Sequence, residues 1–65
     1  MNIVFFSTND VFVGEEKLKD KQINCRIVPT PTTDKAYCGV CLETDNEGAI
    51  EALKDMEFNV IRKGA

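Results

Sequence analysis

Residues 2–10, Asn-Ile-Val-Phe-Phe-Ser-Thr-Asn-Asp, join an apolar run directly to a helix-start signal. The run over residues 2–6 holds β-branched and aromatic side chains, which predicts a buried central strand. Ser7 can accept a hydrogen bond from the amide three residues on, and the Asp10 carboxylate favours a helix N-terminus. Apolar residues then recur at helical spacing, so we expect a helix over residues 8–21.

Gly14 lies in the middle of this expected helix. A glycine there costs up to about 1 kcal/mol of helix stability compared with alanine, so the position needs a reason. We expect the helix to pack closely against the sheet at Gly14.

Two further strands are expected in the middle of the chain. Residues 24–29 predict the second strand, and Pro29 and Pro31 end it because proline has no N–H to donate to a ladder. Residues 38–43 predict the third strand. Its inward side chains are expected to be Cys38, Val40 and Leu42.

A second helix and a fourth strand complete the pattern. Residues 44–47, Thr-Asp-Asn-Glu, have the form of a capping box, which predicts a helix from there to about residue 57. Residues 58–62 alternate in side-chain character and predict the last strand. The apolar stripe of the second helix is Ala49, Ile50, Leu53 and Met56.

The element order is therefore β-α-β-β-α-β, which is that of the ferredoxin-like split β-α-β fold. Right-handed crossovers put both helices on one face of an antiparallel sheet with strand order 4-1-3-2. We expect one α+β domain over residues 1–65, since a chain of this size buries only about 60% of its unfolded surface. The opposite sheet face is expected to leave apolar side chains such as Val4, Phe6 and Ile61, or their alternates in the same strands, in solvent, where a second copy or a partner would cover some of them.

Composition excludes several classes of function. The net charge is −3 and no run of Lys or Arg tracks a phosphate backbone, so we expect no nucleic-acid partner. No segment approaches the roughly 20 apolar residues of a membrane span, so we expect no membrane partner. The N-terminal residues lack the positive region of a signal peptide, and we therefore expect a cytoplasmic protein.

The reactive side chains are few. Histidine is absent, which removes Cys-His and Ser-His nucleophile pairs and imidazole metal ligands. The three cysteines are an odd number, which argues against a disulfide framework. We expect reduced thiols, with Cys25 in the core, and we expect no metal and no cofactor.

Cys38 has the most informative predicted position. In strand order 4-1-3-2 the end of the first strand is level with the start of the third, so Cys38 should lie near the start of the first helix. The unpaired amides and positive dipole of that helix end favour an anion, and the thiolate is the reactive form of cysteine. Gly39 would let the backbone approach closely, and Lys35 could add positive charge, which Asp10 and Asp34 would oppose.

Two other interpretations of the cysteines stay open. Cys38 can equally be a small apolar residue that closes the top of the core. Cys38 and Cys41 have the C-x-x-C spacing of redox and zinc sites, but side chains three apart in a strand point to opposite faces. A closed zinc site also needs four ligands.

The chain resembles a family of small bacterial proteins known as Se/S carrier-like. The resemblance covers nearly the whole chain and rests on Phe-Ser-Thr at residues 6–8, leading into a helix with Glu15. It also rests on Ile-Val-Pro-Thr-Pro at residues 27–31 and on Cys-Gly at residues 38–39. The most specific part is the Pro-x-Pro, loop, Cys-Gly combination.

The resemblance implies a carrier that takes a sulfane sulfur or selenium onto Cys38 as a persulfide and hands it to a protein partner. Members tend to have Arg directly after the second proline, where this chain has Thr32, and Lys35 is a poor substitute for a bidentate Arg. The hypothesis assigns the loop at residues 29–37 to partner docking. The binding residues it names are Ser7, Thr8, Asn9, Pro31, Thr32, Lys35 and Gly39.

Two rival hypotheses come from other classes. A non-catalytic interaction module would associate through the open sheet face with a partner or as a homodimer, and its cysteines would be structural. A redox or metal protein would use Cys38 and Cys41 together. Alkylation, transfer and mass measurements distinguish the three.

Overall fold

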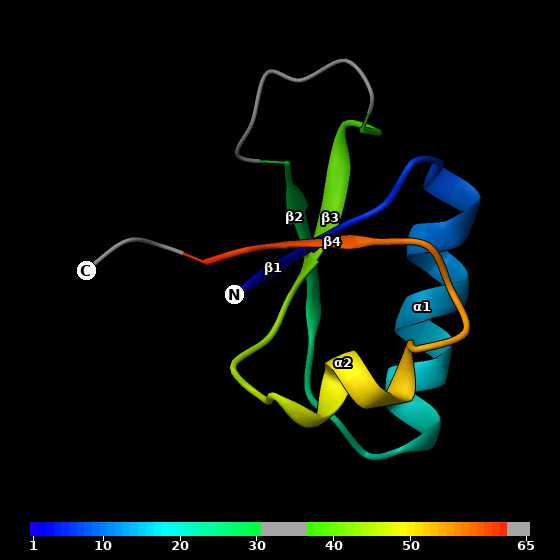
Figure 1. Ribbon diagram of the computed structural model, residues 1–65, viewed down its shortest axis with the longest axis vertical. Helices are drawn as coiled ribbons and strands as arrows, with labels where there is room; N and C mark the ends of the chain where they lie inside the picture. Colours follow the sequence, from blue (N-terminus) through cyan, green and yellow to red (C-terminus); the bar gives the residue numbers. More distant parts are fainter. Residues whose placement is uncertain (31–36, 63–65) are drawn as a thin grey trace.

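The computed structural model describes residues 1–30 and 37–62 and shows an α+β fold with four strands and two helices (Figure 1). Among these residues no helix has the length and apolar character needed to cross a bilayer. The elements in chain order are β1 (Asn2–Val4), α1 (Thr8–Asp20), β2 (Arg26–Pro29), β3 (Val40–Glu43), α2 (Gly48–Ala52) and β4 (Asn59–Ile61).

The four strands form one antiparallel sheet in the order β2-β3-β1-β4, and counted from the β4 edge the same strands follow as 4-1-3-2. β1 lies in the centre, with Ile3 opposite Leu42 of β3 and Val60 of β4. β2 is an edge strand, and its last residue Pro29 pairs with Val40. An edge tolerates proline because an N–H there can point away from the ladder.

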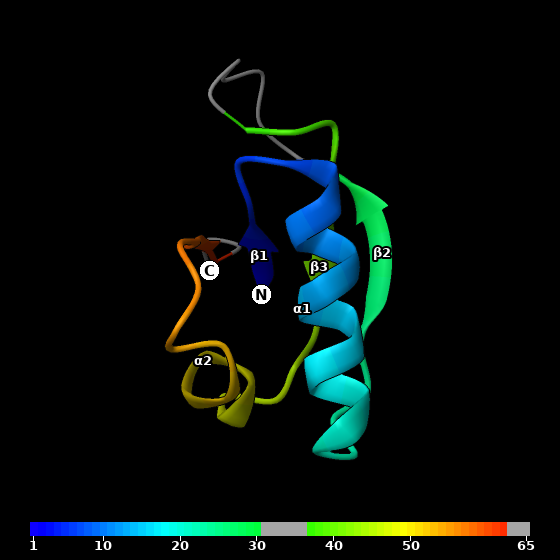
Figure 2. The ribbon, with the colours of Figure 1, turned by 90° about the vertical axis from the view of Figure 1, so that its right-hand side faces the viewer.

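Side chains from both helices and one face of the sheet form a single core. Figure 2 shows α1 running alongside β3 and β2, with α2 crossing near its C-terminal end. The fully buried members of this core are Ile3, Phe5, Val11, Leu18, Leu42, Ala49 and Leu53. Cys38, Val40 and Ile27 are partly buried against it, so odd-numbered β1 residues and even-numbered β3 residues point toward the helices.

α1 begins and packs as its sequence predicts. Ser7 is the N-cap, and its hydroxyl accepts a hydrogen bond from the Asp10 amide at 3.2 Å. A Cβ added at Gly14 would lie 2.9 Å from Phe5 Cζ and 3.3 Å from Leu42 Cδ1. The prediction of close helix–sheet packing at Gly14 is therefore confirmed.

α2 begins later and ends earlier than predicted, and the predicted capping box is wrong. The Thr44 hydroxyl donates to the Asn24 carbonyl at 2.7 Å and accepts from the Asn46 amide at 3.2 Å. It therefore holds the connection before the helix instead of capping it. The Asn46 side chain accepts from the Gly48 amide at 2.8 Å, and Glu47 is the N-cap with no side-chain bond.

The sheet face away from the helices is less apolar at its surface than predicted. Val4, expected in solvent, is completely buried, and so is Cys41 on the same face. Arg26 and Glu43 form an ion pair on this face and are neighbours across β2 and β3. Ile61 is partly exposed, and Phe6 lies outside β1, in the turn before α1.

Candidate thiol site

The backbone of Cys38 is tied to the turn that leads into α1. Its amide donates a hydrogen bond to the Phe5 carbonyl at 3.1 Å, and Phe5 lies two residues before the helix cap Ser7. Figures 1 and 2 both show the segment entering β3 at the end of the molecule where α1 begins. β3 begins at Val40, not at Cys38 as predicted, so Cys38 lies just outside the regular ladder.

The Cys38 sulfur lies on the helix side of the sheet and is partly exposed. Its thiol donates to the Val40 carbonyl, with 2.9 Å between sulfur and oxygen. This bond orients the protonated side chain back along its own strand. An anionic sulfur has no proton to donate, so ionisation breaks this contact.

The first residues of α1 are open to solvent. Ser7, Thr8 and Asn9 are exposed, and the first helical hydrogen bond runs from the Val11 amide to the Ser7 carbonyl at 3.3 Å. Helix geometry therefore supplies no acceptor for the amides of Thr8 and Asn9. The predicted binding residues of this turn are accessible, and they belong to the same end of the fold as Cys38.

Gly39 does not have the role that the sequence suggested. Its φ is not positive, and among the described atoms nothing lies within 4 Å of where its Cβ would be. No close backbone approach requires a glycine here. The residue leaves open space directly beside Cys38.

An aromatic pair joins the residue before Cys38 to the turn before α1. The rings of Phe6 and Tyr37 are tilted by 30° with centroids 5.4 Å apart, and Phe6 is 46% exposed. The Tyr37 hydroxyl accepts a hydrogen bond from the Asn59 side chain at 2.7 Å, which links the residue before Cys38 to β4. Neither aromatic residue was among the predicted binding residues, although Tyr37 lies in the predicted docking loop and Phe6 directly precedes Ser7.

Thr30 was not among the predicted binding residues either, although it lies in the loop that the hypothesis assigns to partner docking. Its amide donates to the Gly39 carbonyl at 3.0 Å, and its hydroxyl donates to the Cys38 carbonyl at 2.8 Å. Its place directly after the last residue of β2 was the available signal. The predicted binding residues Pro31, Thr32 and Lys35 lie outside the described residues.

A family model described as "Putative Se/S carrier protein-like" matches residues 2–62 of the chain. The protein belongs to this Se/S carrier-like family. The match spans all six elements, from β1 to β4, and includes Cys38. Comparison with curated proteins and with solved structures finds no match.

The other two cysteines of this Se/S carrier-like protein have different surroundings. Cys41 is completely buried, and burial raises the pKa of its thiol, while the nearby Thr30 hydroxyl opposes that shift. Cys25 is only partly buried, not in the core as predicted; burial and the nearby Glu15 carboxylate raise its pKa, and Lys19 opposes them. All three cysteines are free thiols, and no cluster of three metal-binding side chains occurs among the described residues.

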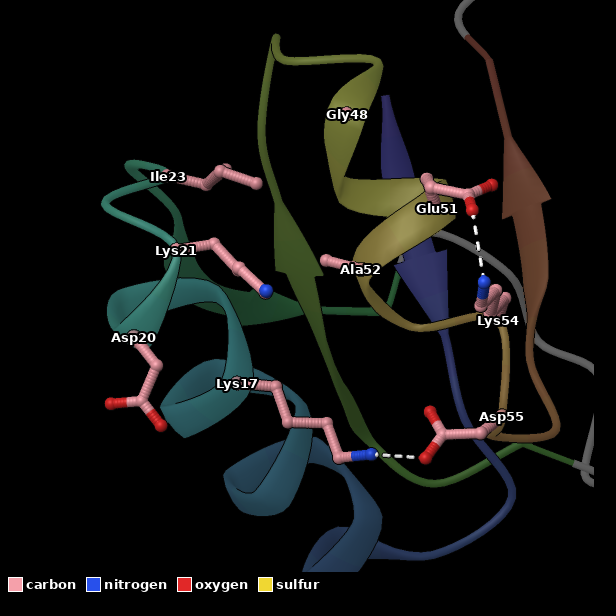
Figure 3. A pocket seen from close by; sticks show the side chains of 9 residues that line it. All are labelled: Lys17, Asp20, Lys21, Ile23, Gly48, Glu51, Ala52, Lys54 and Asp55. Atoms are coloured by element: carbon pink, nitrogen blue, oxygen red, sulfur yellow. Dashed lines mark hydrogen bonds and ion pairs between the residues drawn. The ribbon is translucent and has the colours of Figure 1, made fainter.

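A large groove in the described part of the Se/S carrier-like protein lies elsewhere. It has a volume of about 660 Å³, lies between the C-terminal half of α1 and α2, and contains no cysteine (Figure 3). Its rim is largely paired, with Lys17 bonded to Asp55 at 2.7 Å and Lys54 to Glu51 at 3.2 Å. The groove therefore offers balanced charges and no group that marks a ligand.

Proposed function

We propose that the protein carries a sulfane sulfur or selenium atom on Cys38 and passes it to a partner protein. The observation that carries this proposal is the hydrogen bond from the Cys38 amide to the Phe5 carbonyl. It brings a partly exposed thiol to the turn that opens α1, where backbone amides without helical acceptors favour an anion. Membership of the Se/S carrier-like family supports the same function.

The transfer chemistry needs only thiols and persulfides. The Cys38 proton leaves to solvent, and the thiolate attacks the terminal sulfur of a donor persulfide. A new sulfur–sulfur bond forms on Cys38 as the bond within the donor breaks, and the donor departs as a thiolate. An acceptor thiolate then attacks the same terminal atom and releases Cys38 as a thiolate. Selenium follows the identical course.

The residues around Cys38 have distinct tasks in this proposal. The amides at Ser7, Thr8 and Asn9 and the amide of Gly39 stabilise the anionic terminal sulfur. The open space beside Gly39 gives the donor access. Pro31, Thr32 and Lys35 belong to the loop that we propose contacts the donor and acceptor proteins.

The described cysteines support a single carrier position. Cys41 is completely buried, and burial raises the pKa of both Cys25 and Cys41, which lowers the fraction of each thiol that is ionised at a given pH. We place the reaction in the cytoplasm, where thiols stay reduced.

A two-step transfer experiment tests the proposal. The protein is loaded with inorganic polysulfide, freed of it by gel filtration, and mixed with a second thiol protein of different mass. We expect one sulfur atom to appear on the carrier and then on the acceptor, with Cys25→Ser behaving as the native protein. Loading without release, or equal transfer by Cys38→Ser, contradicts a carrier function.

A further inference from the structure

We infer that Thr30 is a positioning residue for Cys38, holding its peptide group beside the start of α1. The inference rests on the proposed function and goes beyond it, because Thr30 follows β2 and contacts Cys38 from the side opposite to Phe5. Two hydrogen bonds define this Thr30 clamp. They run from the Thr30 amide to the Gly39 carbonyl and from the Thr30 hydroxyl to the Cys38 carbonyl.

The clamp extends the sheet beyond its last regular pair. Pro29 pairs with Val40, so Thr30 comes opposite Gly39 in the same register. Pro29 has no N–H, and the next available donor on β2 is the Thr30 amide, which bonds Gly39 at 3.0 Å. The backbone bond alone would fix Gly39 and leave the Cys38 carbonyl free.

The hydroxyl adds what the backbone cannot supply. It reaches the Cys38 carbonyl at 2.8 Å, while the Cys38 amide is bonded to Phe5 at 3.1 Å. Both peptide groups of Cys38 are therefore held, one by Phe5 directly after β1 and one by Thr30 directly after β2. This fixes the direction of the Cα–Cβ bond, so the remaining freedom of the sulfur is rotation about that bond.

Fixing Cys38 in this way matters for a transfer reaction. The Cys38 sulfur has to attack the incoming sulfur atom in line with the sulfur–sulfur bond that breaks. Alignment of the reacting groups supplies a large part of the rate acceleration in such reactions. Thr30 does not touch the reacting atoms. Its effect reaches them only through the Cys38 backbone.

The matched variants are Thr30→Val, which keeps the shape and removes the hydroxyl, and Thr30→Ser, which keeps the hydroxyl. We expect Thr30→Val to slow sulfur uptake from polysulfide about fivefold, the factor that one ordinary hydrogen bond is worth. Thr30→Ser should load at nearly the native rate. Protection of Cys41 from iodoacetamide shows that each variant is folded, since Cys41 is completely buried.

Hydrogen exchange at the Cys38 amide gives a second readout that does not depend on sulfur chemistry. We expect faster exchange in Thr30→Val than in the native protein and Thr30→Ser. Native uptake and exchange rates in a folded Thr30→Val overturn the clamp while leaving the carrier function intact. A native protein that takes up no sulfur, combined with faster Cys38 exchange in Thr30→Val, contradicts the carrier function and supports the clamp.

Discussion

The Phe5 carbonyl accepts the amide of Cys38 at 3.1 Å, although 33 positions separate the two residues in the sequence (38 − 5 = 33). Phe5 is completely buried in the core, and Cys38 is partly exposed at its edge. The bond therefore ties the backbone of a partly exposed cysteine to a residue of the buried core. Phe5 itself lies two residues before Ser7, which caps α1.

Close packing at Gly14 predicts that Gly14→Ala destabilises the fold. The added methyl would meet the buried rings and side chains of Phe5 at 2.9 Å and Leu42 at 3.3 Å. Overpacking typically costs 1–3 kcal/mol, and better helix propensity returns up to about 1, so we expect a net loss of about 1–2 kcal/mol. Urea unfolding measures it.

Gly39→Ala is the matched control for this substitution. Its Cβ meets no described atom within 4 Å, and its backbone is not left-handed, so its unfolding free energy should stay within about 0.5 kcal/mol of native. A Gly14→Ala protein more stable than the native one would show that α1 can move away from the sheet freely.

Two surface ion pairs predict how stability depends on pH. A hydrogen bond from Lys17 lowers the pKa of Asp55 below its ordinary 3.8, and one from Arg62 lowers that of Glu47 below its ordinary 4.5. A carboxyl group whose pKa is lower in the folded state than in the unfolded state stabilises the fold at pH values above its unfolded-state pKa. This stabilisation is lost as the pH falls through its folded-state pKa. The urea concentration at the midpoint of unfolding should therefore decrease as the pH is lowered below about 4.5.

Asp55→Asn should reduce this acid sensitivity, because the variant lacks the titrating partner of Lys17. Glu51→Gln is the control, since it removes a pair made between neighbouring residues, Lys54 and Glu51. An Asp55→Asn protein with the native pH dependence would mean that the bond to Lys17 does not persist in solution.

The surroundings of Cys25 predict opposite effects of two substitutions on α1. Glu15 raises the Cys25 pKa and Lys19 lowers it. In a Cys38→Ser background, Glu15→Gln should speed alkylation of Cys25 at neutral pH, because more of the thiol ionises, and Lys19→Gln should slow it. Iodoacetamide rates followed by mass spectrometry measure both, and changes of the same sign would contradict the structure.

The buried side chains on the open sheet face predict a monomer. Val4 was expected to lie in solvent on this face, but it is completely buried within one chain, as is Cys41 on the same face, which removes much of the expected apolar surface. Sedimentation velocity at micromolar concentration should give a single species of about 7.3 kDa. A stable dimer would instead favour the interaction-module hypothesis.

The sequence predicts the helix and strand order well because each long element has a clear period. The cap at Ser7 and the close approach at Gly14 follow from local chemistry alone. The position of Cys38 beside the end of β1 follows from the strand order, since antiparallel neighbours bring the end of one strand to the start of the other.

The sequence predictions fail where a side chain interacts with a residue far away in the chain instead of with its sequence neighbours. Thr44 has the sequence position of a cap, but its hydroxyl bonds Asn24, 20 residues away in the chain. Val4 has the position of an exposed residue, and periodicity cannot show what covers the second face of a sheet. Thr30 contacts Cys38 only because of a register that strand patterns do not specify.

The central claim is that Cys38, and not Cys25, accepts the sulfur atom. The most direct test is the intact mass of two variants, Cys25→Ser and Cys38→Ser, after exposure to polysulfide at neutral pH. We predict that Cys25→Ser gains one sulfur atom, removable by dithiothreitol, and that Cys38→Ser gains none. Equal uptake by both variants, or uptake by Cys38→Ser alone, would contradict the account.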